Sequence, residues 1–298
     1  MPEVDVFLIG VPKAGTTWLA YVLDQHHSIT LSNPKEPNII ASHRGTFVRN
    51  KEEPDWGRFE TLFSENGLKL DASIHAFACP LAPSRIKQKI PEAKFILCLR
   101  EPVSRSFSHW NMILNTKEAV ENGVDWSTFE KAWSDNRLRD DSMYGLSMSR
   151  WLKEFNLDSF LIIDSAMLKT DPLSILKRIE IFLKLEPVEY NVDENRHSNS
   201  AASRRPMTLV GKVARLLFSI IPSFVKKPIV EKLQKRDFNI YNLPLLSKKG
   251  VTHSLNSKHY NTCGKEILQD LELFEKLTEF DTSQWSDQIK NQLDIDNF

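Results

Sequence analysis

The sequence predicts an α/β fold whose central parallel sheet is covered by helices on both faces. Short, continuously apolar segments with strand-like composition occur at Val6–Gly10, Phe95–Leu99 and Phe160–Ile163. Segments with helical spacing of apolar residues alternate with them along the chain. A strand that is apolar at every position is buried on both of its faces, which is typical of a parallel sheet between two helical layers.

The first strand leads into the first helix through a turn that contains glycine and proline. Val6–Gly10 ends at the turn signal Gly10-Val11-Pro12, and helical spacing runs from Thr16 to Leu23. This order of strand, loop and helix is the unit from which parallel sheets are built. Leu68–Asp71 is a further candidate strand.

The later elements follow the same pattern. Phe95–Leu99 stops at Arg100-Glu101-Pro102, and a helix is predicted from there through Met112. A stripe at helical spacing that contains Tyr144, Met148 and Trp151 is expected in the core. Towards the C-terminus, apolar residues at three- and four-residue steps predict another helix: Ile267, Leu268, Leu271, Phe274 and Leu277.

The charge balance excludes several classes of partner. Lys plus Arg and Asp plus Glu each number 39, so no net field draws the protein to nucleic acid or to an anionic membrane. Any site for an anion must therefore be local. The sequence has no run of about 18 apolar residues, so no transmembrane helix is expected.

The cysteines and the first residues bear on the compartment. Cys79, Cys98 and Cys263 are too few and too scattered for a disulfide framework or a zinc site, so no metal ligands are predicted. Met1–Asp5 is acidic and leads directly into the first strand, without the basic start and apolar core of a signal peptide. We therefore expect a reducing, cytoplasmic compartment.

The segment from Gly10 to Trp18 predicts a phosphate site. It follows a strand and opens a helix, and helix N-termini present unpaired N–H groups and the positive end of a dipole. Gly15 lets the backbone approach a ligand closely, Thr16 and Thr17 offer hydroxyl donors, and Lys13 adds a positive charge.

The loop differs from that of nucleotide triphosphatases, G-x-x-x-x-G-K-[ST]. Here Thr16 follows the second glycine, and Lys13 precedes that glycine by two residues. This order argues against hydrolysis of magnesium-bound ATP and favours a different phosphate donor. The alternatives are a turn that caps an ordinary helix, a P-loop nucleotide kinase or phosphotransferase, and a nucleotide-binding protein without catalysis.

A second anion site is predicted at Arg100. It follows a central strand, and ligands of open α/β sheets bind at the carboxyl ends of strands. Ser108 lies about two helical turns further on, near the same face as Ser104. The guanidinium and the hydroxyl would together hold a terminal phosphate, although a surface ion pair is the alternative. Two phosphate sites suit one doubly phosphorylated nucleotide.

These motifs resemble the sulfotransferase family that uses 3′-phosphoadenosine 5′-phosphosulfate (PAPS), especially its bacterial and heparan-type carbohydrate members. Pro12–Trp18 is similar to the family's 5′-phosphosulfate loop, and Arg100-Glu101-Pro102 with Ser108 to its 3′-phosphate motif. Lys35-Glu36-Pro37 matches a segment after the first helix. The resemblance implies a P-loop-like parallel sheet of about five strands flanked by helices, and PAPS as co-substrate with no metal.

The resemblance also implies roles for individual residues. Arg100 and Ser108 would hold the 3′-phosphate, and Lys258 occupies the place of a basic loop over the nucleotide, with His259 where the family has glycine. Ala72 stands where heparan-type enzymes carry a lysine. The residues expected around the 5′-phosphosulfate are Lys13, Ala14, Gly15, Thr16, Thr17 and Trp18.

The reaction implied is transfer of the sulfuryl group from PAPS to a hydroxyl or amine of a carbohydrate or small-molecule acceptor. Lys13 would stabilise the leaving phosphate, and a general base would take the acceptor's proton. Glu36 matches the base position of the carbohydrate-type enzymes, and His75 lies near that of the phenol-type enzymes. We favour Glu36, and a structural role is the alternative for each of the two residues.

We expect residues 1–298 to form one sulfotransferase domain with a helical, lid-like insertion at about 203–250. The insertion contains an apolar stretch from Val213 to Phe224, flanked by basic residues, and four prolines interrupt its surroundings. A helix on the membrane and a helix packed on the core are the alternatives. The interruptions favour a cover beside the acceptor site.

Overall fold

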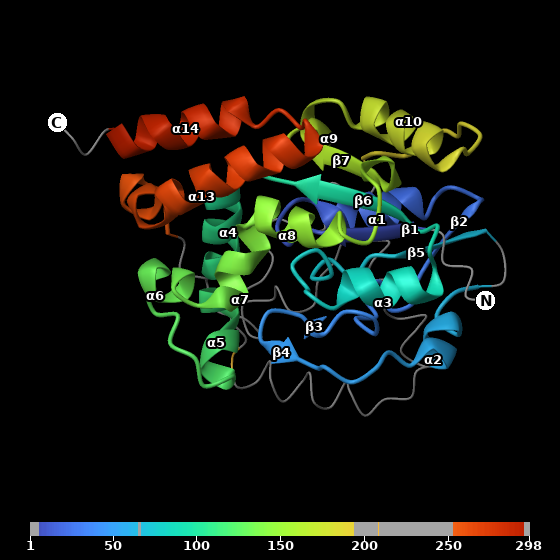
Figure 1. The fold of residues 1–298 in the computed structure, drawn as a ribbon, viewed down its shortest axis with the longest axis horizontal. Coiled ribbons are helices and arrows are strands. Elements are labelled where there is room, and N and C mark those ends of the chain that lie inside the picture. The colour runs from blue at the N-terminus through green and yellow to red at the C-terminus, as the bar shows by residue number, and fades with distance from the viewer. Residues whose placement is uncertain (1–5, 65–66, 194–207, 209–252, 295–298) are drawn as a thin grey trace.

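The computed structural model describes residues 6–64, 67–193, 208 and 253–294 of the chain. Its centre is a five-stranded sheet in the order β2-β5-β1-β6-β7, in which every neighbouring pair is parallel (Figure 1). The predicted α/β class and the number of about five strands are confirmed. The five strands are β1 (Val6–Gly10), β2 (Ile29–Leu31), β5 (Leu68–Asp71), β6 (Lys94–Leu99) and β7 (Phe160–Asp164).

The strand β1 is the middle of the sheet and is buried along its whole length. Phe7 lies in register with Asp71 of β5 on one side and with Phe95 of β6 on the other. The register between β1 and β6 shifts at the end of the strand, between Leu8 and Gly10. The chain therefore leaves the regular ladder just before the loop predicted to bind phosphate.

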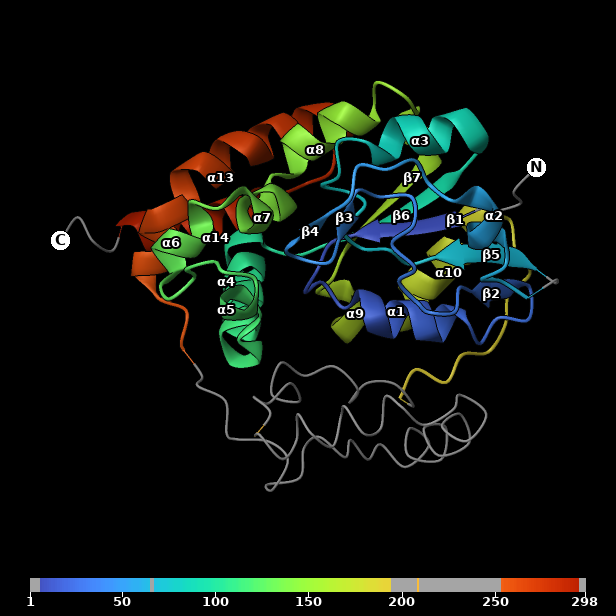
Figure 2. The same ribbon diagram turned by 90° about the horizontal axis from the view of Figure 1, so that it is seen from below.

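Helices cover both faces of the sheet. Figure 2 shows α1 and α9 on one face and α3 and α8 on the other. The helices of the first half are α1 (Thr16–Leu23), α2 (Trp56–Glu60), α3 (Ala82–Lys89), α4 (Pro102–Thr116), α5 (Glu118–Glu121), α6 (Phe129–Trp133) and α7 (Asn136–Arg139). The later ones are α8 (Tyr144–Trp151), α9 (Met167–Thr170), α10 (Pro172–Leu183), α13 (Ser257–Thr278) and α14 (Ser283–Asp294), with 3₁₀ turns at Asp140–Ser142 and Leu157–Ser159.

The predicted helical stripes form the core. Tyr144, Met148 and Trp151 of α8 are fully buried, as are Ile267 and Phe274 of α13. The helix α13 packs against α8, α14 and α4, so the C-terminal part of the chain closes over the helical layer. A two-stranded antiparallel hairpin, β3 (His43–Arg44) and β4 (Val48–Arg49), lies outside the main sheet.

Two sequence predictions concern parts of the chain beyond the core. No helix among the described residues has the length and apolar character needed to cross a membrane. The predicted insertion at about 203–250 lies, except for residue 208, outside the described residues. Its lid function stays a prediction.

Candidate functional site

The loops that follow β1, β2, β5 and β6 leave the sheet at the same edge, because parallel strands all point the same way. These loops carry Lys13, Glu36, His75 and Arg100. Two backbone hydrogen bonds connect the end of β1 and its loop to their neighbours. Phe77 N–H donates to Ile9 O over 2.9 Å, and Val11 N–H donates to Cys98 O over 2.7 Å. The fold thus brings the predicted site residues to one edge of the sheet.

The loop between β1 and α1 has the backbone of an anion site. Gly15 is the N-cap of α1 and has a φ of 79°, a left-handed conformation that favours glycine. A Cβ there would also lie 3.2 Å from Leu168 Cδ1. No side chain caps α1 and no acidic residue lies in its first turn. The N–H groups at the start of α1 are therefore available to a negatively charged ligand.

Residues at the end of β6 hold this loop in place. The Cys98 thiol donates to Ala14 O over 3.0 Å, and Arg100 Nη1 donates to Lys13 O over 3.2 Å. Burial raises the pKa of Cys98, so its thiol keeps the proton that it donates. The structure thereby joins the two predicted phosphate motifs directly, through the contact of Arg100 with the Lys13 backbone.

The side chain of Lys13 extends towards α4. Its ammonium group lies 3.5 Å from the Met112 thioether, which is a weak acceptor. Lys13 itself is half-buried, whereas the neighbouring Gly15 is exposed. This arrangement places a positive charge between the loop and α4.

The turn at Arg100 and the start of α4 are tightly built. The Glu101 carboxylate caps α4 by accepting the N–H groups of Val103 and Ser104 over 2.8 and 2.6 Å. The Tyr144 hydroxyl donates to Arg100 O over 2.7 Å. Ser108 is half-buried on the same helix, two turns after its start. Arg100 is thus fixed at the backbone while its guanidinium spans towards Lys13.

Glu36 lies in the turn between β2 and β3, with its carboxylate 2.5 Å from the Lys35 ammonium. The Glu36 side chain is 27% exposed and that of Lys35 is 12% exposed. A buried carboxylate, Asp71, ends strand β5 nearby. Its pKa is raised to about 6, chiefly by burial; hydrogen bonds from Ser73 oppose the shift, and the charge of Glu36 makes a smaller contribution to it. Glu36 is accessible and Asp71 is not.

His75 belongs to a buried polar cluster. Its Nδ1 lies 3.6 Å from Asp141 Oδ2, and the same oxygen lies 3.7 Å from His109 Nδ1 and 3.9 Å from Arg105 Nη1. His109 is completely buried, and burial followed by the Arg105 charge lowers its pKa. The neutral His109 ring hydrogen-bonds the Thr46 hydroxyl over 2.8 Å. The cluster thus connects His75, the β3–β4 hairpin, α4 and the turn at Asp141.

Four other predicted residues lie around these groups. Lys258 lies in the first turn of α13 and forms an ion pair of 3.0 Å with Glu130 of α6. The Trp18 indole N–H donates to Val192 O over 3.3 Å, and its ring is buried against the core. Thr16 is buried and Thr17 is half-buried.

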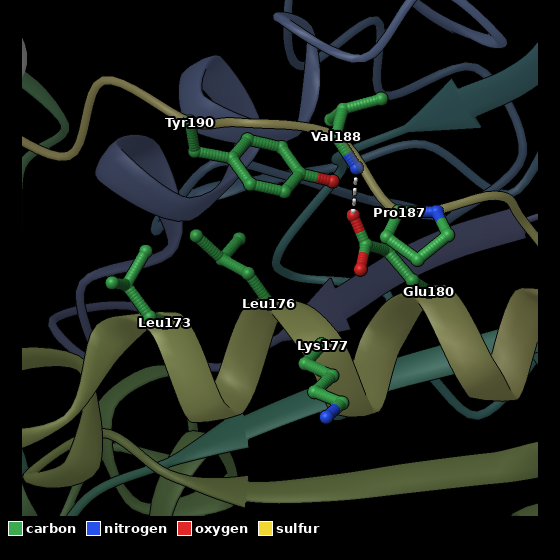
Figure 3. Close-up of a pocket in the computed structure, with 7 residues that line it drawn as sticks. All are labelled: Leu173, Leu176, Lys177, Glu180, Pro187, Val188 and Tyr190. Carbon is green, nitrogen blue, oxygen red and sulfur yellow. Dashed lines mark hydrogen bonds between the residues drawn. The ribbon is translucent and has the colours of Figure 1, made fainter.

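A pocket of about 310 Å³ lies elsewhere on the molecule (Figure 3). Its walls come from α10 and the segment after it, and the Val188 N–H donates to Glu180 Oε1 across it over 3.0 Å. Its lining is mostly apolar and contains none of the predicted site residues: Leu173, Leu176, Lys177, Glu180, Pro187, Val188 and Tyr190. A doubly phosphorylated ligand does not suit it.

Sequence reasoning missed the residues that support the loops. Cys98 was predicted only as one of three scattered cysteines, and Asp71 only as the last residue of a strand. A charged residue that ends an otherwise apolar strand is a signal for Asp71. Ser73 gave no comparable signal, because its role depends on a contact with a distant segment.

Comparisons with known proteins agree with this geometry. A family profile described as the sulfotransferase domain matches residues 3–208. Mouse heparan sulfate glucosamine 3-O-sulfotransferase 5 is 29% identical over 279 residues, which cover 87% of this chain and 72% of that protein. Mouse bifunctional heparan sulfate N-deacetylase/N-sulfotransferase 4 is 27% identical over 200 residues, which cover 63% of this chain and only 23% of that protein.

Solved structures add a comparison of folds. A sulfotransferase from Alicyclobacillus acidocaldarius superposes with a TM-score of 0.60 and 15% identity, over 96% of this chain and 98% of that one. At this identity the similarity concerns the fold, and it agrees with the observed sheet and its helical layers.

Proposed function

The chain belongs to the sulfotransferase domain family, and on that premise we propose that it transfers the sulfuryl group of PAPS to a hydroxyl or amine of a carbohydrate or small-molecule acceptor. The observation that carries the proposal is the open first turn of α1 behind Lys13, tied to Arg100 by a hydrogen bond of 3.2 Å. One nucleotide with phosphates at both its 5′ and 3′ positions satisfies both halves of this site.

The backbone geometry suits the 5′ end of such a nucleotide. Gly15 keeps the approach to the α1 N-terminus open, and the loop residues Ala14, Thr16 and Thr17 surround it. Lys13 supplies the charge that a leaving phosphate requires. Arg100 and Ser108, from β6 and α4, take the 3′-phosphate, and Trp18 and Lys258 remain candidate contacts.

The proposed step is an in-line displacement. The acceptor oxygen or nitrogen forms a bond to sulfur while the bond from sulfur to the bridging phosphate oxygen breaks, and adenosine 3′,5′-bisphosphate leaves. The proton of the acceptor goes to a protein base. Lys13 and the N–H groups of the loop stabilise the negative charge that develops on the leaving phosphate.

We assign the base role to Glu36 in preference to His75. A base must reach the acceptor, and Glu36 is partly exposed, whereas the His75 side chain is 9% exposed and faces Asp141. Accepting the proton requires Glu36 to exchange part of its contact with Lys35 for the acceptor. Lys35 then remains beside the reaction as a positive charge.

The relatives bear on the acceptor. Two of the most similar are named for acting on heparan sulfate glucosamine or heparan sulfate. A carbohydrate acceptor is therefore the class that we place first, with small alcohols and amines next. The cytoplasmic compartment also stays a prediction.

The test is an acceptor screen with sulfur-labelled PAPS, run on the wild type and on Glu36→Gln. With the wild type we expect labelled product from at least one carbohydrate. With Glu36→Gln we expect the rate to be lower by a factor of about 10² or more. His75→Gln is the companion variant, because it removes the competing base. Transfer that survives Glu36→Gln and is lost in His75→Gln reverses the assignment.

The screen also separates the alternative functions. A phosphotransferase would move phosphate from ATP in the presence of Mg²⁺ and would leave PAPS intact. A nucleotide-binding protein without catalysis would bind adenosine 3′,5′-bisphosphate and transfer nothing to any acceptor. Either result contradicts the proposed function.

A further inference from the structure

The turn that carries Glu36 is hydrogen-bonded at one end to strand β5 and at the other end to the segment directly after β5. At its start, Ser32 N–H donates to Leu70 O over 3.0 Å, and the Ser32 hydroxyl donates to Lys35 O over 3.1 Å. At its end, Asn38 N–H donates to the Ser73 hydroxyl oxygen over 3.0 Å. The turn is therefore held by residues that directly precede or follow the end of β5.

Asp71 holds Ser73, the residue that accepts the Asn38 N–H at the end of the turn. Asp71 Oδ1 accepts the Ser73 N–H over 2.8 Å. Ser73 is therefore held by Asp71 through its backbone, while its hydroxyl oxygen accepts the Asn38 N–H. The side-chain amide of Asn38 in turn donates to Glu36 O over 3.1 Å. A continuous line of hydrogen bonds runs from Asp71 through Ser73 and Asn38 to the backbone of Glu36.

The buried carboxylate of Asp71 lowers the stability of the folded protein when it is ionised. Asp71 is 2% exposed, and its burial raises its pKa to about 6 from 3.8. The folded protein therefore holds this proton more tightly than the unfolded chain, and the contribution of Asp71 to stability falls as the pH rises from about 4 to about 6. Above that range the ionised group opposes folding, so stability does not explain why it is a carboxylate.

We propose that Asp71 and Ser73 are positioning residues, which hold the turn at residues 32–38 so that the Glu36 carboxylate stays in place for proton transfer. The inference rests on the proposed function, because it assumes that Glu36 is the base. A charged acceptor makes a stronger hydrogen bond than a neutral one. The carboxylate therefore holds Ser73 more firmly than an amide would. Ser73 in turn holds Asn38, because its hydroxyl oxygen accepts the Asn38 N–H.

The main test removes the middle of this line with Ser73→Ala. We expect kcat to fall about tenfold, because a small displacement of a catalytic group has a large effect on the rate. The Kd for adenosine 3′,5′-bisphosphate should change less than about twofold, because the network does not touch the nucleotide loop. Hydrogen exchange of the backbone amides in residues 32–38 should become faster, because the Asn38 N–H loses its acceptor.

A control is Ser84→Ala, which removes a half-buried hydroxyl on α3 that donates to Leu81 O over 3.3 Å. It should leave kcat and the exchange of the turn unchanged. Asp71→Ala and Asp71→Asn form a second pair. The first should resemble Ser73→Ala, while the second should retain a kcat between that of Asp71→Ala and that of the wild type, because the amide oxygen still accepts the Ser73 N–H but more weakly than a carboxylate. Asp71→Asn should also melt at a higher temperature than the wild type above pH 6.

The readouts separate a failure of this inference from a failure of the proposed function. Hydrogen exchange needs neither donor nor acceptor substrate, so unchanged exchange of the turn in Ser73→Ala overturns the inference by itself. A normal kcat in Ser73→Ala or in Asp71→Ala overturns it as well. Absence of transfer by the wild type instead refutes the proposed function, and the role of Glu36 as a base falls with it.

Discussion

Lys13 takes part in the loop through both its backbone and its side chain. Its backbone has a φ of 74°, and its carbonyl accepts a hydrogen bond from Arg100. Its ammonium group reaches the Met112 thioether, a partner that holds a cation only weakly. A negatively charged phosphate offers this ammonium a far stronger interaction, so the side chain is positioned to change partner when a nucleotide binds.

Lys13→Ala should lower kcat by about 10²-fold, because the ammonium acts mainly on charge that develops in the transition state. The melting temperature should change little, since the residue lies in a loop and its side chain is half-buried. Lys153→Ala, an exposed lysine after α8, is the control for loss of one positive charge. Turnover of Lys13→Ala close to that of the wild type would remove this residue from the mechanism.

Among the site residues, those in local motifs are the ones that can be predicted from the sequence. Lys13, Gly15 and Arg100 stand in short patterns whose strand and helix context is visible in the sequence. The link from Asp71 through Ser73 to Asn38 was not predicted, because it joins segments 35 residues apart. Hydrogen bonds between distant segments leave no periodic signal in one sequence.

Among the elements, α8 braces the site from behind the sheet. The Tyr144 hydroxyl at its start holds Arg100 O over 2.7 Å, and the Trp151 indole at its end holds Phe77 O over 2.9 Å. Asp270 of α13 caps α8 by accepting the N–H groups of Gly145 and Leu146, both over 2.8 Å. A Cβ on Gly145 would lie 2.4 Å from Asp270 O, so only glycine permits this contact.

Asp270→Ala should destabilise the protein by about 1–2 kcal/mol, because it leaves the buried Gly145 N–H and the N–H of Leu146 at the start of α8 without their acceptor. Asp270→Asn keeps an oxygen at that place and should lose less. Melting temperatures of the three proteins at neutral pH provide the measurement. Equal values for the wild type and Asp270→Ala would show that α8 does not depend on this cap.

The elements that the sequence predicts are those with enough apolar residues to show a period. The strands β1, β6 and β7 are continuous apolar runs, and the core stripe of α8 repeats at helical spacing. The strand β2 has three residues, and β3 and β4 have two each. Such short strands form because neighbouring strands offer hydrogen bonds, and their own residues carry no pattern.

For the whole molecule, the parallel sheet accounts for the site. Four loops from distant parts of the chain leave one edge of the sheet, and they carry the predicted phosphate loop, the turn with Glu36, His75 and Arg100. The chain has no net charge, so the nucleotide binding that we propose would depend on the local arrangement of N–H groups, Lys13 and Arg100. A ligand that uses both phosphate motifs at once should therefore bind far better than one that uses a single motif.

The most direct test is calorimetric titration of the wild type and of Arg100→Ala with adenosine 3′,5′-bisphosphate, and separately with ATP and Mg²⁺. The account predicts that the wild type prefers the bisphosphate, and that Arg100→Ala weakens its binding about ten- to a hundredfold, the effect of losing one charged hydrogen bond to phosphate. Tighter binding of ATP with Mg²⁺, or equal affinity of both proteins for the bisphosphate, would contradict it.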